Sequence, residues 1–130
     1  MERAAFVQLV AEVIDNLPAF FRERLANVAV EVMPLAPPEL AQSVGRRPWN
    51  LLGLYHGIPY GRRGPWYGNV LPDRVLIFQR PIERYARSEE KIRALVRRVV
   101  IHEIGHYFGL SDAELHRLET EADENNAGQD

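Results

Sequence analysis

The 130-residue sequence contains no cysteine. This absence excludes disulfide bonds, thiolate metal ligands and cysteine nucleophiles, so a bound metal ion would have to be held by His, Asp or Glu side chains. Lysine is almost absent too, because Lys91 is the only one among the 16 basic residues. We attach no functional meaning to this preference for arginine.

The sequence also has no large excess of charge of either sign and no long hydrophobic run. Its 18 acidic and 16 basic side chains leave a net charge of −2, whereas a dedicated nucleic-acid-binding protein usually shows a strongly basic field. No apolar run approaches the ~20 residues that cross a membrane. We therefore expect a cytoplasmic protein that has neither a nucleic acid nor a membrane as its partner.

The rest of the composition is that of a globular protein. Apolar residues make up 46% of the chain and charged residues 26%, and the length suits one domain. We expect a single domain over residues 1–130. Its tail should fray after about residue 120, where the sequence becomes acidic and then rich in Asn, Gly and Gln.

Hydrophobic periodicity predicts an α+β fold with a sheet of about three strands. A helical period from about residue 4 to 17 predicts an amphipathic N-terminal helix, which Pro18 interrupts or restarts for a short continuation to Leu25. The three predicted strands are 28–33, 51–56 and 75–78. The third is apolar on both faces, as expected for a strand that is covered on both sides.

Two segments between these strands are poor in regular structure. Residues 34–49 contain four prolines, so no extended element is expected there apart from one helical turn near Glu39. Residues 57–69 contain four glycines, two prolines and three aromatic residues without any period. This second segment should be a loop, either a lid over a substrate or an ordinary surface loop.

A long helix is predicted between two clear end signals. Ser88 is a suitable N-cap, Glu89 and Glu90 suit the first turn, and the helix should run to about Phe108 and stop at Gly109. In its first half the apolar residues share one face. From Val99 on they spread around the helix, which predicts that the second half runs through the protein interior.

A short C-terminal helix is expected after this glycine. Residues 111–114 form a capping-box pattern, and Leu115 and Leu118 then fall on one side of the helix. The predicted domain is thus a small sheet packed with an N-terminal helix, a central helix and a short C-terminal helix.

The central helix carries the clearest chemical signal of the sequence. Residues 102–112 read H-E-x-x-H-x-x-G-x-x-D. Residues four apart lie on one face of a helix, so His102 and His106 can present imidazole nitrogens to one ion. Glu103 lies one step around the helix, where it suits a general base that takes a proton from water. The pattern predicts a zinc site in which Val99, Ile104 and Phe108 provide dry, apolar surroundings.

The third ligand is less sharply defined than the two histidines. Asp112 follows the turn at Gly109 and is the expected ligand, although a carboxylate there would also suit the dipole of the next helix. His116 lies one helical turn beyond Asp112 and can contact that carboxylate or replace it as ligand. Other possible oxygen ligands come later in the chain, and these are Glu119, Glu121 and Glu124.

Two residues at the end of the second predicted strand are further candidates. Tyr55 and His56 would stabilise an oxyanion if their side chains faced the metal site. Ordinary packing at the end of a strand is the alternative interpretation.

The quoted residues resemble a known family. The segment 102–112, preceded by L-L-G-L-Y-H-G-I-P at 51–59 and L-P-D-R-V-L-I-F at 71–78, is similar to the short bacterial zincin-like metallopeptidases, or minimal zincins. The resemblance implies a compact α+β zincin core in which His102, His106 and Asp112 hold Zn²⁺ and Glu103 is the catalytic base. The spacing also resembles that of the metzincins, but Asp112 stands where those enzymes have a third histidine, and no methionine follows to form a Met-turn.

Three functions are compatible with these residues. We expect a zinc-dependent peptidase that acts on a peptide or protein, with the substrate lying along an exposed strand edge such as 51–56. A metal-dependent ribonuclease is the first alternative, because a bacterial RNA-processing family has three histidines at this spacing, although it lacks the glutamate. The second alternative is a binding or regulatory module that holds zinc without proteolytic activity.

Overall fold

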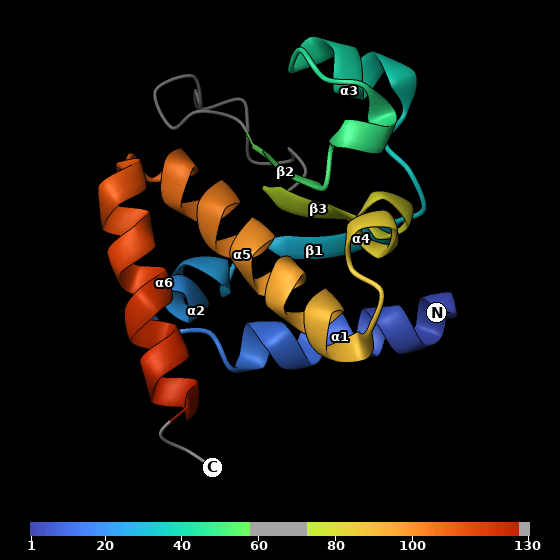
Figure 1. Cartoon of the computed structure of the whole chain (residues 1–130). Coiled ribbons are helices and arrows are strands. Elements are labelled where there is room, and N and C mark those ends of the chain that lie inside the picture. Colours follow the sequence, from blue (N-terminus) through green and yellow to red (C-terminus); the bar gives the residue numbers. More distant parts are fainter. Residues whose placement is uncertain (58–72, 128–130) are drawn as a thin grey trace.

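Figure 1 shows the computed structural model of the chain, which describes the backbone of residues 1–57 and 73–127 and the side chains of residues 1–57 and 73–119. Along this part of the chain the elements are α1 (Arg3–Asp15), α2 (Ala19–Leu25), β1 (Ala29–Met33), α3 (Pro38–Ser43), the 3-10 helix η1 (Pro48–Asn50), β2 (Gly53–His56), β3 (Arg74–Phe78), α4 (Gln79–Tyr85), α5 (Glu89–Tyr107) and α6 (Asp112–Ala127). The predicted α+β class and the helices around a three-stranded sheet are confirmed. From residue 58 on, the predicted loop at 57–69 lies outside the described residues.

The sheet has the order β1-β3-β2, with β3 in the middle. Strand β1 pairs with β3 in parallel, and β2 pairs with β3 antiparallel in a register that sets Gly53 opposite Ile77. The four residues Val75–Phe78 are all buried, as predicted for a strand covered on both faces. Among the described strands, β2 therefore lies at an edge of the sheet.

The two faces of β3 belong to two separate hydrophobic clusters. Val75 and Ile77 pack with α1, α2 and α5 in the larger cluster, whereas Leu76 and Phe78 pack with Ala41 of α3 and its neighbours. Figure 1 shows this layering, with α5 and α1 on one side of the sheet and α3 on the other. The core thus fixes α5 across one face of the sheet, close to β2.

Both ends of α5 form as the sequence predicts. The Ser88 hydroxyl accepts a hydrogen bond from the Lys91 amide at 3.2 Å. At the other end Gly109 has a φ of 80°, which a side chain would strain. The amides of Gly109 and Leu110 donate to the carbonyls of His106 and Gly105 at 3.0 and 2.8 Å, which is the bonding pattern of a Schellman motif. The chain therefore turns sharply two residues after α5.

This turn brings α6 back against α5. The predicted capping box is present, because the Ser111 hydroxyl accepts from the Glu114 amide at 3.2 Å and donates to the Glu114 carboxylate at 3.1 Å. Leu115 is fully buried and lies directly over Gly105, where a Cβ atom would collide with the leucine side chain. The backbone of α6 continues as helix to Ala127, past the position near residue 120 where we expected fraying.

The prediction that the second half of α5 runs through the interior is wrong for one face. Val100, Ile101 and Ile104 are fully buried, but the side opposite them stays accessible, and Phe108 is 45% exposed. The apolar residues that spread around the helix include Val99, which is only half-buried. Phe108 therefore does not shield the predicted site from water.

Helix α4 has no counterpart among the elements predicted from the sequence. Pro81 occupies the third position of α4, where an amide has no partner within the helix, so the proline costs no hydrogen bond. None of the helices in the described residues is long and apolar enough to cross a membrane.

Candidate functional site

The two histidines of the sequence motif lie on neighbouring turns of α5. The ring centroids of His102 and His106 are 5.8 Å apart, and the rings are inclined at 79° to each other. The His102 side chain is 36% exposed and the His106 side chain 53%. Both imidazoles are therefore accessible on the face of α5 that the core leaves uncovered.

Each imidazole faces a carboxylate from α6. Asp112 Oδ1 lies 3.0 Å from His106 Nε2, and the Asp112 side chain is 88% exposed. Asp112 follows the turn at Gly109, so the turn brings it beside the second histidine as the motif spacing predicts. Because both side chains are exposed, His106 and Asp112 can change rotamer without disturbing the core.

The second carboxylate is that of Glu119, two helical turns after Asp112. Its Oε1 atom lies 2.7 Å from His102 Nε2, and the side chain is only 19% exposed. The separation of Glu119 Oε1 and His102 Nε2 is within the range of an ion pair. Within the described residues, however, this buried oxygen makes no hydrogen bond of acceptable geometry. A buried carboxylate oxygen without such a bond is costly, and it faces the nitrogen that would hold a metal ion.

These side chains are not yet gathered around one point. In residues 1–57 and 73–119, no group of three His, Asp or Glu side chains is close enough together to hold an ion. The donors are nevertheless of the type that zinc takes, namely two imidazoles and a carboxylate. Because His106 and Asp112 are largely exposed, a change of rotamer is sufficient to redirect them.

Glu103 lies on the other side of His102, toward the sheet. The Tyr55 amide donates a hydrogen bond to Glu103 Oε2 at 3.3 Å. Burial raises the pKa of the Glu103 carboxyl above its ordinary value, and the hydrogen bond from the Tyr55 amide and the electrostatic effects of His106 and Arg46 oppose this shift only in part. A raised pKa makes the carboxylate a stronger proton acceptor, which suits a general base.

The edge strand β2 reaches Glu103 because Gly53 lets it approach α5 closely. A Cβ atom at Gly53 would lie 2.5 Å from Val99 Cγ1 and 3.0 Å from the Leu76 carbonyl oxygen. The Phe78 amide donates to the Leu52 carbonyl at 3.0 Å, and bonded residues alternate along an antiparallel pair. The backbone groups of Gly53 and Tyr55 therefore point away from β3, to the side of β2 that pairs with no other described strand, which we call its free edge.

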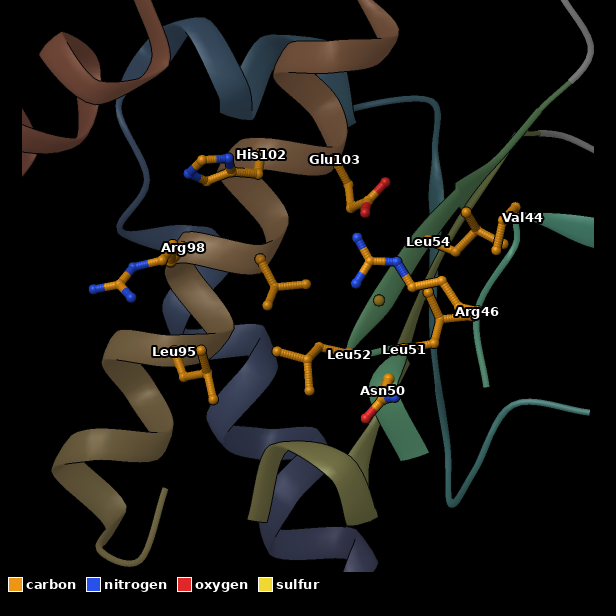
Figure 2. A pocket seen from close by; sticks show the side chains of 12 residues that line it. Val44, Arg46, Asn50, Leu51, Leu52, Leu54, Leu95, Arg98, His102 and Glu103 are labelled. Atoms are coloured by element: carbon orange, nitrogen blue, oxygen red, sulfur yellow. The ribbon is translucent and has the colours of Figure 1, made fainter. Parts of the chain in front are cut away.

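A pocket of about 400 Å³ lies between β2 and α5, with Glu103 and His102 at one end. Figure 2 shows the Glu103 carboxylate directed toward it, whereas the His102 ring points away. Figure 2 also shows Arg46 entering the pocket from the segment after α3. The pocket thus joins the predicted base to the edge of the sheet.

The remaining candidates have different surroundings. The Tyr55 hydroxyl donates to Asp73 Oδ2 at 2.9 Å, and its ring stacks on Tyr107 with centroids 3.9 Å apart, so Tyr55 reaches Glu103 through its backbone. His56 and His116 are exposed. The side chains of Glu121 and Glu124 lie outside the described ones.

A family model described as zincin-like metallopeptidase matches residues 25–122. The chain belongs to this family. The match spans the whole sheet, α5 with its histidines, and most of α6. No curated protein matches the chain.

Sequence reasoning on this zincin-like metallopeptidase missed two features of the site. Arg46 lies beside Glu103 only through the fold, because it is far away in the sequence and belongs to no motif. Glu119 was considered as a distant alternative, and its acidic neighbours gave no sign that it is mostly buried. Gly53 did carry a signal, since a glycine inside a strand often marks a close approach of another segment.

Proposed function

We propose that this zincin-like metallopeptidase hydrolyses peptide bonds with a zinc ion held by His102, His106 and Asp112, and with Glu103 as the general base. The observation that carries the proposal is the position of Glu103. It is next to His102 in the chain, is largely buried, and is bonded to the free edge of β2. The proposed base and the edge strand therefore line one pocket together with His102, and His106 follows one helical turn later on α5.

The donors fit zinc in their chemistry, because neutral imidazole and carboxylate are its usual ligands in catalytic sites. The buried Glu119 Oε1 atom facing His102 Nε2 also supports a cation at this place. When bound, zinc would supply Lewis-acid chemistry, which lowers the pKa of water and polarises a carbonyl group.

The chain's own residues support the remaining steps. Gly53 on the free edge of β2 offers backbone groups that can pair with an extended peptide. Glu103 takes a proton from the attacking water and then gives it to the leaving amine. The Tyr55 amide holds the Glu103 carboxylate at 3.3 Å, which orients the base toward the peptide.

The proposal is tested by measuring zinc content and hydrolysis together. We expect about one zinc ion per chain after purification, cleavage of members of a peptide library, loss of cleavage with a chelator, and its return when zinc is added. The kcat/KM should fall toward acid pH through the raised pKa of Glu103. Absence of bound zinc would contradict the proposal. RNA cleavage without peptide cleavage would favour the ribonuclease, and bound zinc without hydrolysis would favour a binding module.

The choice between the two carboxylates is a separate prediction. We expect Asp112→Asn to lower the affinity for zinc at least about tenfold more than Glu119→Gln does, because Asp112 is the residue of the motif and is able to rotate. The affinity is measured by competition with a chromophoric chelator. Asp15→Asn is the control, since this exposed residue at the end of α1 does not line the pocket beside Glu103. The reverse order of the two effects would assign the third ligand to Glu119.

The cytoplasmic location expected from the sequence remains a prediction.

A further inference from the structure

The pocket beside Glu103 has aliphatic walls. They come from both sides of the gap, with leucines from the segment that leads into β2 and with Leu95 and Val99 from α5. The apolar lining residues are Val44, Leu51, Leu52, Leu54, Leu95 and Val99. A volume of about 400 Å³ lies in the range of sites for small ligands. The walls therefore suit an aliphatic side chain.

One cation interrupts these apolar walls. Figure 2 shows the Arg46 guanidinium directed into the pocket, between Glu103 and Leu52. Its backbone is fixed, because Gly45 adopts a φ of 71° after α3 and the Arg46 amide donates to the Ala41 carbonyl at 2.9 Å. Ala41 is itself fully buried. The guanidinium is thus presented to the pocket by an anchored turn.

Arg46 has no carboxylate of its own in the described part of the chain. No hydrogen bond or ion pair from its guanidinium to another described residue is found, and Glu103 affects it only through the longer-range attraction of opposite charges. An arginine that faces an apolar pocket without a partner favours a ligand that brings a negative charge.

The charged residues around the pocket also favour a ligand with a negative charge. A second hollow adjoins the first and shares Arg46, Asn50, Leu52 and Leu95 with it. Across both hollows the lining includes Arg46, Arg47 and Arg98, while Glu103 is the single acidic residue among the described residues that line them. The whole protein has a net charge of −2, so this groove is locally positive on a slightly acidic protein and attracts anionic ligands.

We propose that this groove selects peptides in which a carboxylate lies next to an aliphatic side chain, and that Arg46 binds the carboxylate. The aliphatic side chain fills the leucine-lined pocket, and the guanidinium pairs with the carboxylate through charge-assisted hydrogen bonds. An internal Asp or Glu side chain and a free C-terminus both supply this chemistry. The inference rests on the proposed function, since the bound peptide is taken to be the substrate. It concerns binding, however, and can be tested without measuring hydrolysis.

The experiment measures peptide binding to the Glu103→Gln variant by calorimetry in buffer that contains zinc. Three unlabelled peptides share an Ala-Leu core. One has Glu after the leucine and an amidated end, one has Gln there and an amidated end, and one ends at the leucine with a free carboxylate. We expect one or both carboxylate peptides to bind about 10- to 100-fold more tightly than the neutral one, and added salt to reduce the difference. The better of the two identifies the source of the carboxylate.

The role of Arg46 is isolated by a second substitution in the same background. Arg46→Met should abolish the preference for a carboxylate and leave binding of the neutral peptide within about twofold. Arg22→Met removes the same charge from an exposed position on α2, outside both hollows, and should leave the preference intact. Because Gln replaces Glu103 throughout, an effect of Arg46 on the charge of the base cannot contribute.

Several outcomes would overturn the inference. Equal affinity for the three peptides would do so, as would a preference that survives Arg46→Met. Tighter, Arg46-dependent binding of a short single-stranded RNA would assign the groove to nucleic acid instead. Carboxylate binding by Arg46 without cleavage of any peptide by the wild-type protein would refute the proposed function alone. Equal cleavage of acidic and neutral peptides would refute the selectivity alone.

Discussion

The Glu103→Gln variant is expected to lose about 10²–10⁴-fold in kcat/KM for any peptide that the wild-type protein cleaves, while it keeps its zinc. Gln has nearly the shape of Glu and can still accept the hydrogen bond from the Tyr55 amide, but it cannot take a proton from water. Because Glu103 is not one of the proposed ligands, metal analysis should give the same zinc content for both proteins. The loss should therefore appear in the chemical step.

The same variant provides its own test of folding. Burial raises the pKa of Glu103, so the ionised carboxylate is costly to the folded state. That cost is absent below the ordinary pKa of glutamate and grows as the pH rises through the raised value. In chelator at neutral pH, the Tm of the variant should therefore equal or exceed that of the wild-type protein. Full peptidase activity in a folded, zinc-loaded variant would exclude Glu103 as the base.

Gly105→Ala is expected to destabilise the fold by at least about 2 kcal/mol, although alanine is the better helix former by about 1 kcal/mol. The added Cβ would collide with Leu115, which is fully buried between α5 and α6. Relief of the collision requires Leu115 to adopt another rotamer in a packed core or α6 to move away from α5. Since α6 carries Asp112 and Glu119, which face the two histidines, zinc affinity should fall together with stability. Urea unfolding measures the first effect and a chelator competition the second.

A double-mutant cycle with Leu115→Ala separates the collision from other effects. Leu115→Ala alone should cost about 2–5 kcal/mol because it leaves a cavity. When the two substitutions are combined, the Cβ atom that Gly105→Ala introduces meets a smaller side chain, so the total cost should be less than the sum of the single costs. Additive costs would show that the contact between these two residues does not limit the approach of the helices.

The parts of the site that could be predicted from the sequence are those set by local rules. A helix places residues four apart on one face, so the spacing of His102 and His106 was sufficient to pair them. Ser88 and Gly109 marked the ends of α5 through hydrogen bonds that each needs with its near neighbours. The same holds for the capping box that opens α6. Each of these features depends on a few consecutive residues.

The parts that could not be predicted depend on contacts between distant segments. Arg46 reaches Glu103 because α3 packs on one face of the sheet and α5 on the other side of β2, and no local pattern records this arrangement. The burial of Glu119 depends on how α6 packs on α5, which the leucine over Gly105 decides. The prediction that the second half of α5 is buried all around failed for a related reason. The period of a helix does not reveal which of its faces another element covers.

The hydrogen bond between the Tyr55 amide and Glu103 has a consequence for the position of the cleaved bond. Outward-facing groups repeat every second residue of a strand, about 6.8 Å, so a peptide paired with β2 can shift only by two residues at a time. If Arg46 holds a carboxylate of that peptide, the distance from the carboxylate to the bond beside Glu103 is set in whole residue pairs. Different peptides would then be cleaved at one common distance from the carboxylate that Arg46 holds.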